Sequence, residues 1–282
     1  KVTDCERELS KELIARAQLF AGVEGGINFW AQEVFEKGPI KVLDLCKEGE
    51  YREDTASILK ANGEQVLDEL AKYKIELIAP GKKFDELPAP PIALTIKGNK
   101  ELLEKPSIAI VGTRNPTAYG AKVASEMAAN FVDREWVVVS GGAYGIDTAA
   151  HKGALIAEGE TVAVLASGLN VLYPAGNARL FAAIEESGLL VSEYMPGTPA
   201  LPFRFLNRNR IIAAIADGTM VVEAAFRSGA LRTAHDAAAL NRKVMAIPGP
   251  ITSPLSEGCH RIIGDGSAMI CTGVSDAIEV MR

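Results

Sequence analysis

The sequence predicts an α/β fold in which a small all-α domain precedes a doubly wound, mostly parallel sheet. From residue 107 onward, short apolar strands alternate with amphipathic helices, whereas the first 75 residues show helical periodicity. Proline-rich residues 80–92 separate the two regions. Apolar strands that alternate with helices form parallel sheets covered on both faces. We therefore expect a helical domain over 1–75 and an α/β domain over 76–282.

Composition limits the class of protein. The chain has 282 residues, of which 48% are hydrophobic, enough for a sizeable core. It contains no uninterrupted apolar run of about 18 residues, so we expect no transmembrane helix. Its charged N-terminal stretch lacks the apolar segment of a signal peptide. The cysteines form no CxxC pair and are expected to be reduced thiols of a cytoplasmic protein: Cys5, Cys46, Cys259 and Cys271.

The N-terminal region is expected to be a small bundle of short helices. Residues 8–20 and 55–75 place apolar side chains at the three- and four-residue spacing of an amphipathic helix. Lys37-Gly38-Pro39 interrupts the pattern before residues 40–49. After the proline-rich segment, residues 92–98 have the pattern of a strand.

Six apolar segments of the second region are predicted to be strands, with amphipathic helices between them. These strands are 107–111, 136–140, 161–166, 189–194, 219–224 and 243–249. Right-handed crossovers place the carboxyl end of every parallel strand at one edge of the sheet. Ligands of open α/β sheets bind at that edge. The loops that follow the strands therefore predict where the functional site lies.

Two successive glycine loops at that edge have the character of an anion site. The first loop, GTRNPTAYG, carries Thr113 and Arg114, and the second, GGAYGID, contributes Gly141, Gly142 and Gly145. Without side-chain bulk, backbone N–H groups can approach a phosphate, and the following helix N-terminus adds partial positive charge. Neither loop has the lysine and hydroxyl of a P-loop or the GxGxxG spacing of a dinucleotide-binding loop. We therefore expect no cofactor.

A basic helix is predicted at the same edge, within FRFLNRNRII (203–212). Arg204 and Arg208 are four residues apart, as are Phe205 and Asn209, and Arg210 follows, so three arginines lie on the first turns of one helix. A polyanion would relieve their repulsion, and a phenylalanine could stack on a base. The chain has a net charge of −6, but residues 204–242 carry six arginines against three acidic residues. This patch is compatible with DNA binding; the alternative is a solvated basic face with buried phenylalanines.

A third small-residue turn, at Ser228 and Gly229, completes the set of candidate binding residues. Glu223 ends a strand at the ligand edge and is either a catalytic acid or a structural carboxylate. The histidines are interpreted as packing or surface residues: His151, His235 and His260. The HExxH, GxSxG and acidic metal motifs are absent from the sequence, so we expect no metal site and no catalytic residue.

Five segments, in order along the chain, resemble the DNA-processing protein A (DprA/Smf) family. They are VGTRNPTAYG, SGGAYGIDTAAHKGAL, FLNRNRII, VVEAAFRSGALRTAHDAAALNRKVMAIPGP and EGCHRIIGDGSAM, and the resemblance extends from about Ile92 to Met281. It implies a Rossmann-like core preceded by a sterile-alpha-motif-like (SAM-like) helical domain. It also implies a competence protein of natural transformation that binds and protects incoming single-stranded DNA and loads the RecA recombinase during DNA recombination. We therefore expect a homodimer and no enzymatic activity.

The resemblance further implies the position of a DNA pocket. The family uses the arginine after the first glycine turn, the second glycine loop and the basic helix. The corresponding residues here are Arg114, Gly141, Gly142, Gly145, Arg208, Asn209 and Arg210. Arg204 and Phe205 lie on the approach to this pocket, and the small-residue turns add Thr113, Ser228 and Gly229.

Two rival functions remain open at this point. One is a nucleotide phosphoribohydrolase-like enzyme of a related Rossmann-like class, although the turn RSGALRTA lacks the glutamate that such enzymes place there. The other is an assembly protein that binds itself and a recombinase through apolar patches and contacts DNA only weakly.

Overall fold

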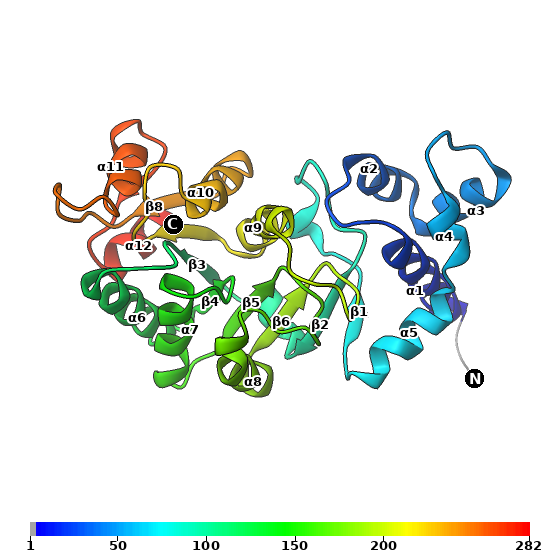
Figure 1. Ribbon diagram of the computed structural model, residues 1–282, viewed down its shortest axis with the longest axis horizontal. Coiled ribbons are helices and arrows are strands. Elements are labelled where there is room, and N and C mark those ends of the chain that lie inside the picture. The colour runs from blue at the N-terminus through cyan, green and yellow to red at the C-terminus, as the bar shows by residue number, and fades with distance from the viewer. Residues whose placement is uncertain (1–3) are drawn as a thin grey trace. The chain divides into compact units, whose positions relative to one another are not determined.

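The computed structural model describes residues 4–282. The chain forms two compact units, and Figure 1 colours both by residue number. The N-terminal unit extends to Lys97 and takes in residues 167–171 and 192–199; the larger unit comprises 98–166, 172–191 and 200–282. The expected domain limits, 1–75 for a helical domain and 76–282 for an α/β domain, stay a prediction. No helix within the described residues is both long enough and apolar enough to cross a membrane.

The N-terminal unit consists of short helices followed by an antiparallel pair of strands. Its helices are α1 (Asp4–Gly22), α2 (Asn28–Lys37), α3 (Pro39–Glu48), α4 (Ala56–Lys60) and α5 (Gly63–Lys72). The 3-10 helix η1 (Lys82–Phe84) lies between β1 (Glu76–Ile78) and β2 (Leu94–Gly98), which pair with each other. Leu19, Ile58 and Leu70 bury the apolar faces of α1, α4 and α5. The helical bundle was thus predicted correctly, and β1 was not expected.

The larger unit contributes neighbouring strands in the order β6-β5-β4-β3-β7-β8-β9, and the pairs from β5 to β9 are parallel. They are β3 (Ser107–Val111), β4 (Val137–Ser140), β5 (Thr161–Leu165), β6 (Leu189–Ser192), β7 (Gly218–Val221), β8 (Lys243–Ala246) and β9 (Met269–Ile270). The central strand β3 pairs in parallel with both β4 and β7, so that Ile108 lies opposite Val138 on one side and Gly218 on the other. All the strands predicted for this region are present, and β9 is an addition.

Helices cover both faces of this sheet (Figure 1). On one face, Ile108 and Ile110 of β3 pack with Phe131 of α6 (Ala118–Val132) and Ala150 of α7 (Ile146–Ile156). On the other face lie α9 (Pro202–Ile215) and α10 (Gly229–Ala239). The remaining helices are η2 (Lys100–Glu104), η3 (Ala175–Asn177), α8 (Ala178–Ser187), α11 (Glu257–Gly264) and α12 (Val274–Met281). The doubly wound α/β fold is therefore confirmed.

The strand order creates a topological switch point between β3 and β7. From β3 the chain proceeds outward through β4 and β5 to β6, and it then returns to form β7 on the other side of β3. The loops after β3 and β7 therefore diverge, which opens a crevice in doubly wound sheets. Helix α9, which carries the basic segment, is the connection that makes this return.

Candidate functional site

A pocket of about 690 Å³ lies at the carboxyl ends of the strands, beside the switch point between β3 and β7. Its walls come from the loops that follow the strands from β3 to β7 and from helices α9 and α10, all within the larger unit. Its volume is typical of a ligand cleft. The predicted binding residues that line it are Thr113, Arg114, Phe205, Arg208, Asn209, Ser228 and Gly229.

Phe205 is the aromatic centre of this pocket. The guanidinium carbon of Arg114 lies 4.8 Å from the centre of its ring, and that of Arg208 lies 5.7 Å from it. Tyr173 approaches the same ring, with 5.6 Å between the two ring centres. Cations placed over an aromatic face are attracted by its electron density. Sequence reasoning missed Tyr173, because a lone tyrosine in the loop after β5 belongs to no recognisable pattern.

Arg208 is a buried structural link as well as part of the pocket wall. Only 6% of the residue is exposed. Its Nη1 donates hydrogen bonds to the carbonyl oxygens of Gly141 at 2.6 Å and Val164 at 2.7 Å, at the ends of β4 and β5. Its Nε donates to Oδ1 of Asn209 at 3.2 Å. Because a guanidinium carries five donors in a planar fork, Arg208 can hold two strand ends and still contact the pocket.

Asp147, which was not among the predicted site residues, organises the second glycine loop. It lies in the first turn of α7 and accepts hydrogen bonds from the amides of Gly141 at 3.1 Å and Ala143 at 3.3 Å. Burial raises the pKa of the Asp147 carboxyl, and the charge of Arg208 acts in the opposite direction. Two amides of the loop therefore donate to an internal carboxylate and not to the pocket. The sequence could have indicated this role, because Asp147 is an acidic residue at the predicted start of a helix, where unpaired backbone N–H groups lie.

Gly141, Gly142 and Gly145 do not line the pocket, but they belong to the loop that supports it. Gly145 has a φ of +86°, and a Cβ there would lie 2.4 Å from the carbonyl oxygen of Thr113 and 2.6 Å from that of Arg114. The next amide, of Ile146, donates to the same Thr113 oxygen at 3.1 Å. This close approach joins the second glycine loop to the first. Gly145 thereby sets the position from which Arg114 extends.

The other two arginines of α9 do not line the pocket either. Arg204 is 9% exposed, and its guanidinium carbon lies 5.3 Å from the ring centre of Phe203. Nη1 of Arg210 donates to the carbonyl oxygen of Asn207 at 3.1 Å. Since a helix turns about 100° per residue, Arg208 and Arg210 point in nearly opposite directions. DNA contacts by Arg204 and Arg210 therefore stay a prediction.

Hydrogen bonds from side chains hold the loops after β3 and β7. The carboxylate of Glu223, 2% exposed, accepts from the amide of Thr117 at 2.9 Å and from its hydroxyl at 2.5 Å. Oγ of Ser228 accepts an amide hydrogen bond at the start of α10, and Nδ2 of Asn209 donates to the carbonyl oxygen of Gly229 at 3.2 Å. Glu223, which follows β7, thus holds Thr117 at the start of α6, and this structural contact gives no support to a hydrolase role for it.

The histidines occupy packing and surface positions. His151 is fully buried with its Nδ1 2.7 Å from Oγ1 of Thr161, Nε2 of His260 accepts a backbone amide, and His235 is exposed. The side chain of Cys5 lies outside the described part of the chain. The other cysteines are buried free thiols: Cys46, Cys259 and Cys271. Among the described side chains, no group of three or more His, Cys, Asp or Glu is arranged to hold a metal ion.

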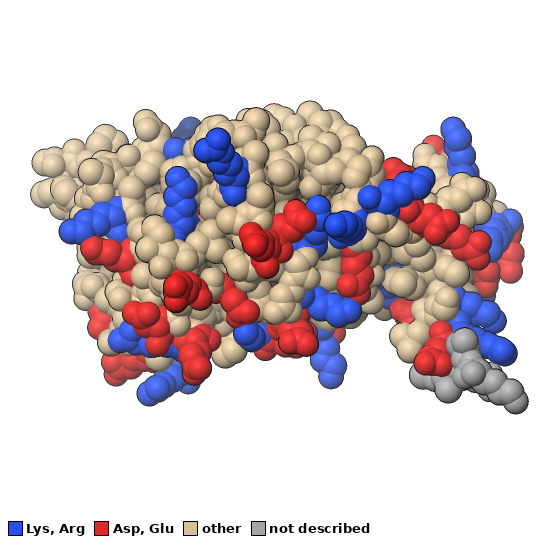
Figure 2. Space-filling view, turned by 90° about the horizontal axis from the view of Figure 1, so that it is seen from below, with Lys and Arg blue, Asp and Glu red and all other residues tan. Residues whose placement is uncertain are grey.

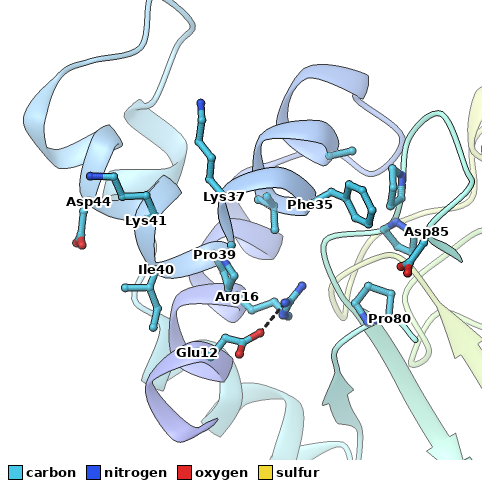
Figure 3. A pocket seen from close by; sticks show the side chains of 15 residues that line it. Glu12, Arg16, Phe35, Lys37, Pro39, Ile40, Lys41, Asp44, Pro80 and Asp85 are labelled. Carbon is cyan, nitrogen blue, oxygen red and sulfur yellow. Dashed lines mark hydrogen bonds and ion pairs between the residues drawn. The ribbon is translucent and has the colours of Figure 1, made fainter. Parts of the chain in front are cut away.

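Charge distinguishes the pocket around Phe205 from a second pocket in the N-terminal unit. Arg114 and Arg208 face the single acid Asp147 in the first. The second, of about 490 Å³, balances basic with acidic side chains (Figure 3): Arg16, Lys37 and Lys41 with Glu12, Asp44 and Asp85. Acidic and basic side chains also intermingle over the face drawn in Figure 2. Because a polyanion needs an excess of positive charge, the pocket around Phe205 is the better candidate.

Known proteins resemble both the sequence and the fold. A sequence model of the family described as DNA recombination-mediator protein A matches residues 80–282. A curated relative from Mycobacterium tuberculosis, described as a DNA processing protein, is 52% identical over 171 residues, which cover 61% of this chain and 44% of the relative. The chain thus spans less than half the length of that relative.

Two solved structures extend the comparison. The X-ray structure of DNA processing protein A (DprA) from Streptococcus pneumoniae matches 99% of this chain and 98% of its own, with a TM-score of 0.79 and 34% identity. A structure of DNA processing protein A from Helicobacter pylori, described for its single-stranded DNA binding mode, matches 74% of this chain and 95% of its own. Its TM-score is 0.69 at 28% identity.

Proposed function

Because the chain belongs to the DNA recombination-mediator protein A family, we propose that it binds single-stranded DNA, without regard to base sequence, at the pocket around Phe205. The observation that carries this proposal is the aromatic ring of Phe205, which has the guanidinium groups of both Arg114 and Arg208 close to it beside the switch point of the sheet. The Helicobacter pylori relative, described for its single-stranded DNA binding mode, supports the same class of ligand.

A single strand offers this pocket two kinds of chemical group. Its bases expose their π faces, and stacking on an aromatic side chain tolerates every base, so Phe205 and Tyr173 would accept bases. Its phosphates would pair with the exposed guanidinium of Arg114 and release counterions. A duplex keeps its bases stacked inside and offers mainly phosphates. The pocket would therefore prefer single strands.

The bound single strand has a proposed role in DNA recombination. We propose that the protein protects incoming single-stranded DNA during natural transformation in the cytoplasm and loads RecA recombinase onto it. Membership of a family of recombination mediators supports this role. We also propose that it acts as a homodimer and that its N-terminal helices form a SAM-like domain. Two linked pockets would hold one strand more tightly than a single pocket can.

The DNA-binding step is tested by titrating the protein with labelled oligothymidine and with a duplex of the same length over a series of salt concentrations. The single strand should bind more tightly, and the logarithm of its affinity should fall with the logarithm of salt by about 0.7 per phosphate contacted. Equal binding of both forms, or binding that salt does not weaken, contradicts the proposal.

The recombinase step needs a separate measurement. RecA filament assembly on the oligonucleotide is followed with and without the protein, at a protein concentration that saturates the strand. Faster assembly is expected. An unchanged rate leaves DNA binding intact but removes the loading role.

A further inference from the structure

We propose that Phe226, together with Arg227 and Arg261, forms a second stacking site for single-stranded DNA at the rim of the pocket around Phe205. The inference rests on the proposed function, and it adds a contact that neither glycine loop nor the basic helix supplies. A strand held at Phe205 would then be held again where it leaves the pocket.

The loop after β7 places Phe226 at that rim. Ala225 and Ser228 line the pocket, and the two residues between them, Phe226 and Arg227, are both exposed. Phe226 is not one of the residues that line the pocket, and 40% of it is open to solvent. A single exposed ring is common on protein surfaces, so the charged groups around it decide what it can bind.

Two guanidinium groups lie close to this ring. The guanidinium carbon of Arg261 is 3.9 Å from the ring centre, and that of Arg227 is 5.8 Å from it. Phe205 likewise has two guanidinium carbons near its ring centre, that of Arg114 at 4.8 Å and that of Arg208 at 5.7 Å. At both positions an aromatic face for a base lies beside positive charge for the neighbouring phosphates.

The fold brings Arg261 to the ring through a close contact of α11 with the loop after β7. The amide of Gly258, at the start of α11, donates to the carbonyl oxygen of Ala224 at 2.8 Å. A Cβ at Gly258 would lie 2.6 Å from that oxygen, so only glycine permits the approach. Arg261 follows three residues later, almost one helical turn along, and thereby reaches over Phe226.

Arg261 remains available to a ligand in this position. Its side chain is 57% exposed, and the nearby carboxylate of Glu257 has its Oε1 4.0 Å from Nη2 of Arg261. An ion pair at that distance and exposure is weak. A phosphate could therefore replace Glu257 as the partner of the guanidinium without loss of a strong interaction.

A pair of strands with and without bases separates stacking from simple charge attraction. The probes are oligothymidine and an abasic oligomer of equal length, each titrated against the parent chain, Phe226→Leu and Arg114→Ala. The matched control is Phe35→Leu, which changes another exposed phenylalanine, 50% open to solvent, in the pocket of Figure 3. Phe226→Trp supplies an optical readout, because a base that stacks on the new indole quenches its fluorescence.

Phe226→Leu should weaken oligothymidine binding roughly 5- to 100-fold, the usual effect of losing one stacked base, and leave abasic binding unchanged. Phe35→Leu should change neither, and only oligothymidine should quench Phe226→Trp. The second site is overturned if Phe226→Leu binds oligothymidine like the parent, if it loses affinity for both probes equally, or if Phe226→Trp is not quenched. In each of these cases, weakened oligothymidine binding by Arg114→Ala still supports the proposed function. If the parent binds neither probe, the proposed function fails and this inference fails with it.

Discussion

The guanidinium of Arg114 lies over the ring of Phe205, 4.8 Å from its centre, and thereby joins the loop after β3 to helix α9. The contact holds the charge of Arg114 in one place while the residue stays exposed to a ligand. Because each side chain orients the other, we expect the two to act as one binding unit. Energetic effects of side chains in contact are not additive.

The first prediction concerns this pair. Arg114→Ala should weaken oligothymidine binding about tenfold, because one charge-assisted contact is lost, and should lower the salt slope by about 0.7. Phe205→Leu should weaken binding by a similar amount through lost stacking. The double variant should lose less than the two single losses combined. Fluorescence anisotropy over a series of salt concentrations measures all three.

An arginine elsewhere in the same unit provides the control for total charge. Arg134 follows α6 at the opposite edge of the sheet, and its Nη1 donates to the carbonyl oxygen of Asn130 at 3.0 Å. Arg134→Ala removes the same charge and should bind oligothymidine like the parent. If it loses as much affinity as Arg114→Ala, binding follows net charge and the pocket is wrongly placed.

The second prediction is that Arg208 contributes to stability as well as to binding. Arg208→Ala leaves the carbonyl oxygens of Gly141 and Val164 without this donor and removes the positive charge beside buried Asp147. Buried carbonyl oxygens without a donor and a buried carboxylate without its cation together lower the free energy of unfolding by about 3 kcal/mol. Urea denaturation should show that loss in the free energy of unfolding, with Arg208→Lys between Ala and the parent. A parent-like unfolding curve for Arg208→Ala would mean that the two hydrogen bonds carry little energy.

The third prediction compares two glycines of the site. Gly145→Ala should lower the free energy of unfolding by about 1–3 kcal/mol, because its positive φ and the Thr113 oxygen both oppose a Cβ. Gly229 has no heavy atom within 4 Å of the position of a Cβ, so Gly229→Ala should leave stability unchanged or raise it slightly. Thermal and urea denaturation of both variants measure the difference. Equal stability of the two would show that the loop relaxes around the new methyl group.

The fourth prediction is a pH dependence of stability caused by His151. Burial, assisted by the charge of Arg208, lowers the pKa of His151 to about 3 in the folded protein, against about 6.5 in unfolded chains. As the pH falls below about 6.5, the unfolded chain binds a proton that the folded chain does not take up until about pH 3. The free energy of unfolding should therefore fall through this window by up to about 1.4 kcal/mol per pH unit, and His151 should contribute no slope above it.

Substitutions at two histidines test this source of the slope. His151→Gln should flatten the dependence of the unfolding free energy on pH between about 6.5 and 3, measured by urea denaturation across that range. His235→Gln, at an exposed position, serves as the control and should keep the parent slope. If both variants keep the parent slope, His151 is not the source of the pH dependence.

The sequence was sufficient for the architecture because the signals for architecture are local. Apolar runs marked the strands from β3 to β8, and helical periodicity marked both the N-terminal bundle and the helices around the sheet. Right-handed crossovers then implied one ligand edge, where Thr113, Arg114, Phe205, Arg208, Asn209, Ser228 and Gly229 do meet. The five motifs also indicated the family correctly.

Local patterns did not reveal how the site is held together, since that depends on packing between distant segments. The loop whose amides were expected to face a phosphate gives two of them to Asp147, and Arg208 is buried against two strand ends. Helical rotation turns Arg210 away from Arg208, although the two are almost adjacent in the chain. Composition and periodicity by themselves determined the fold class and the edge that carries the site. Only the tertiary structure decided which side chains meet there, because Tyr173 with Phe205, and Arg261 with Phe226, come together through long-range packing.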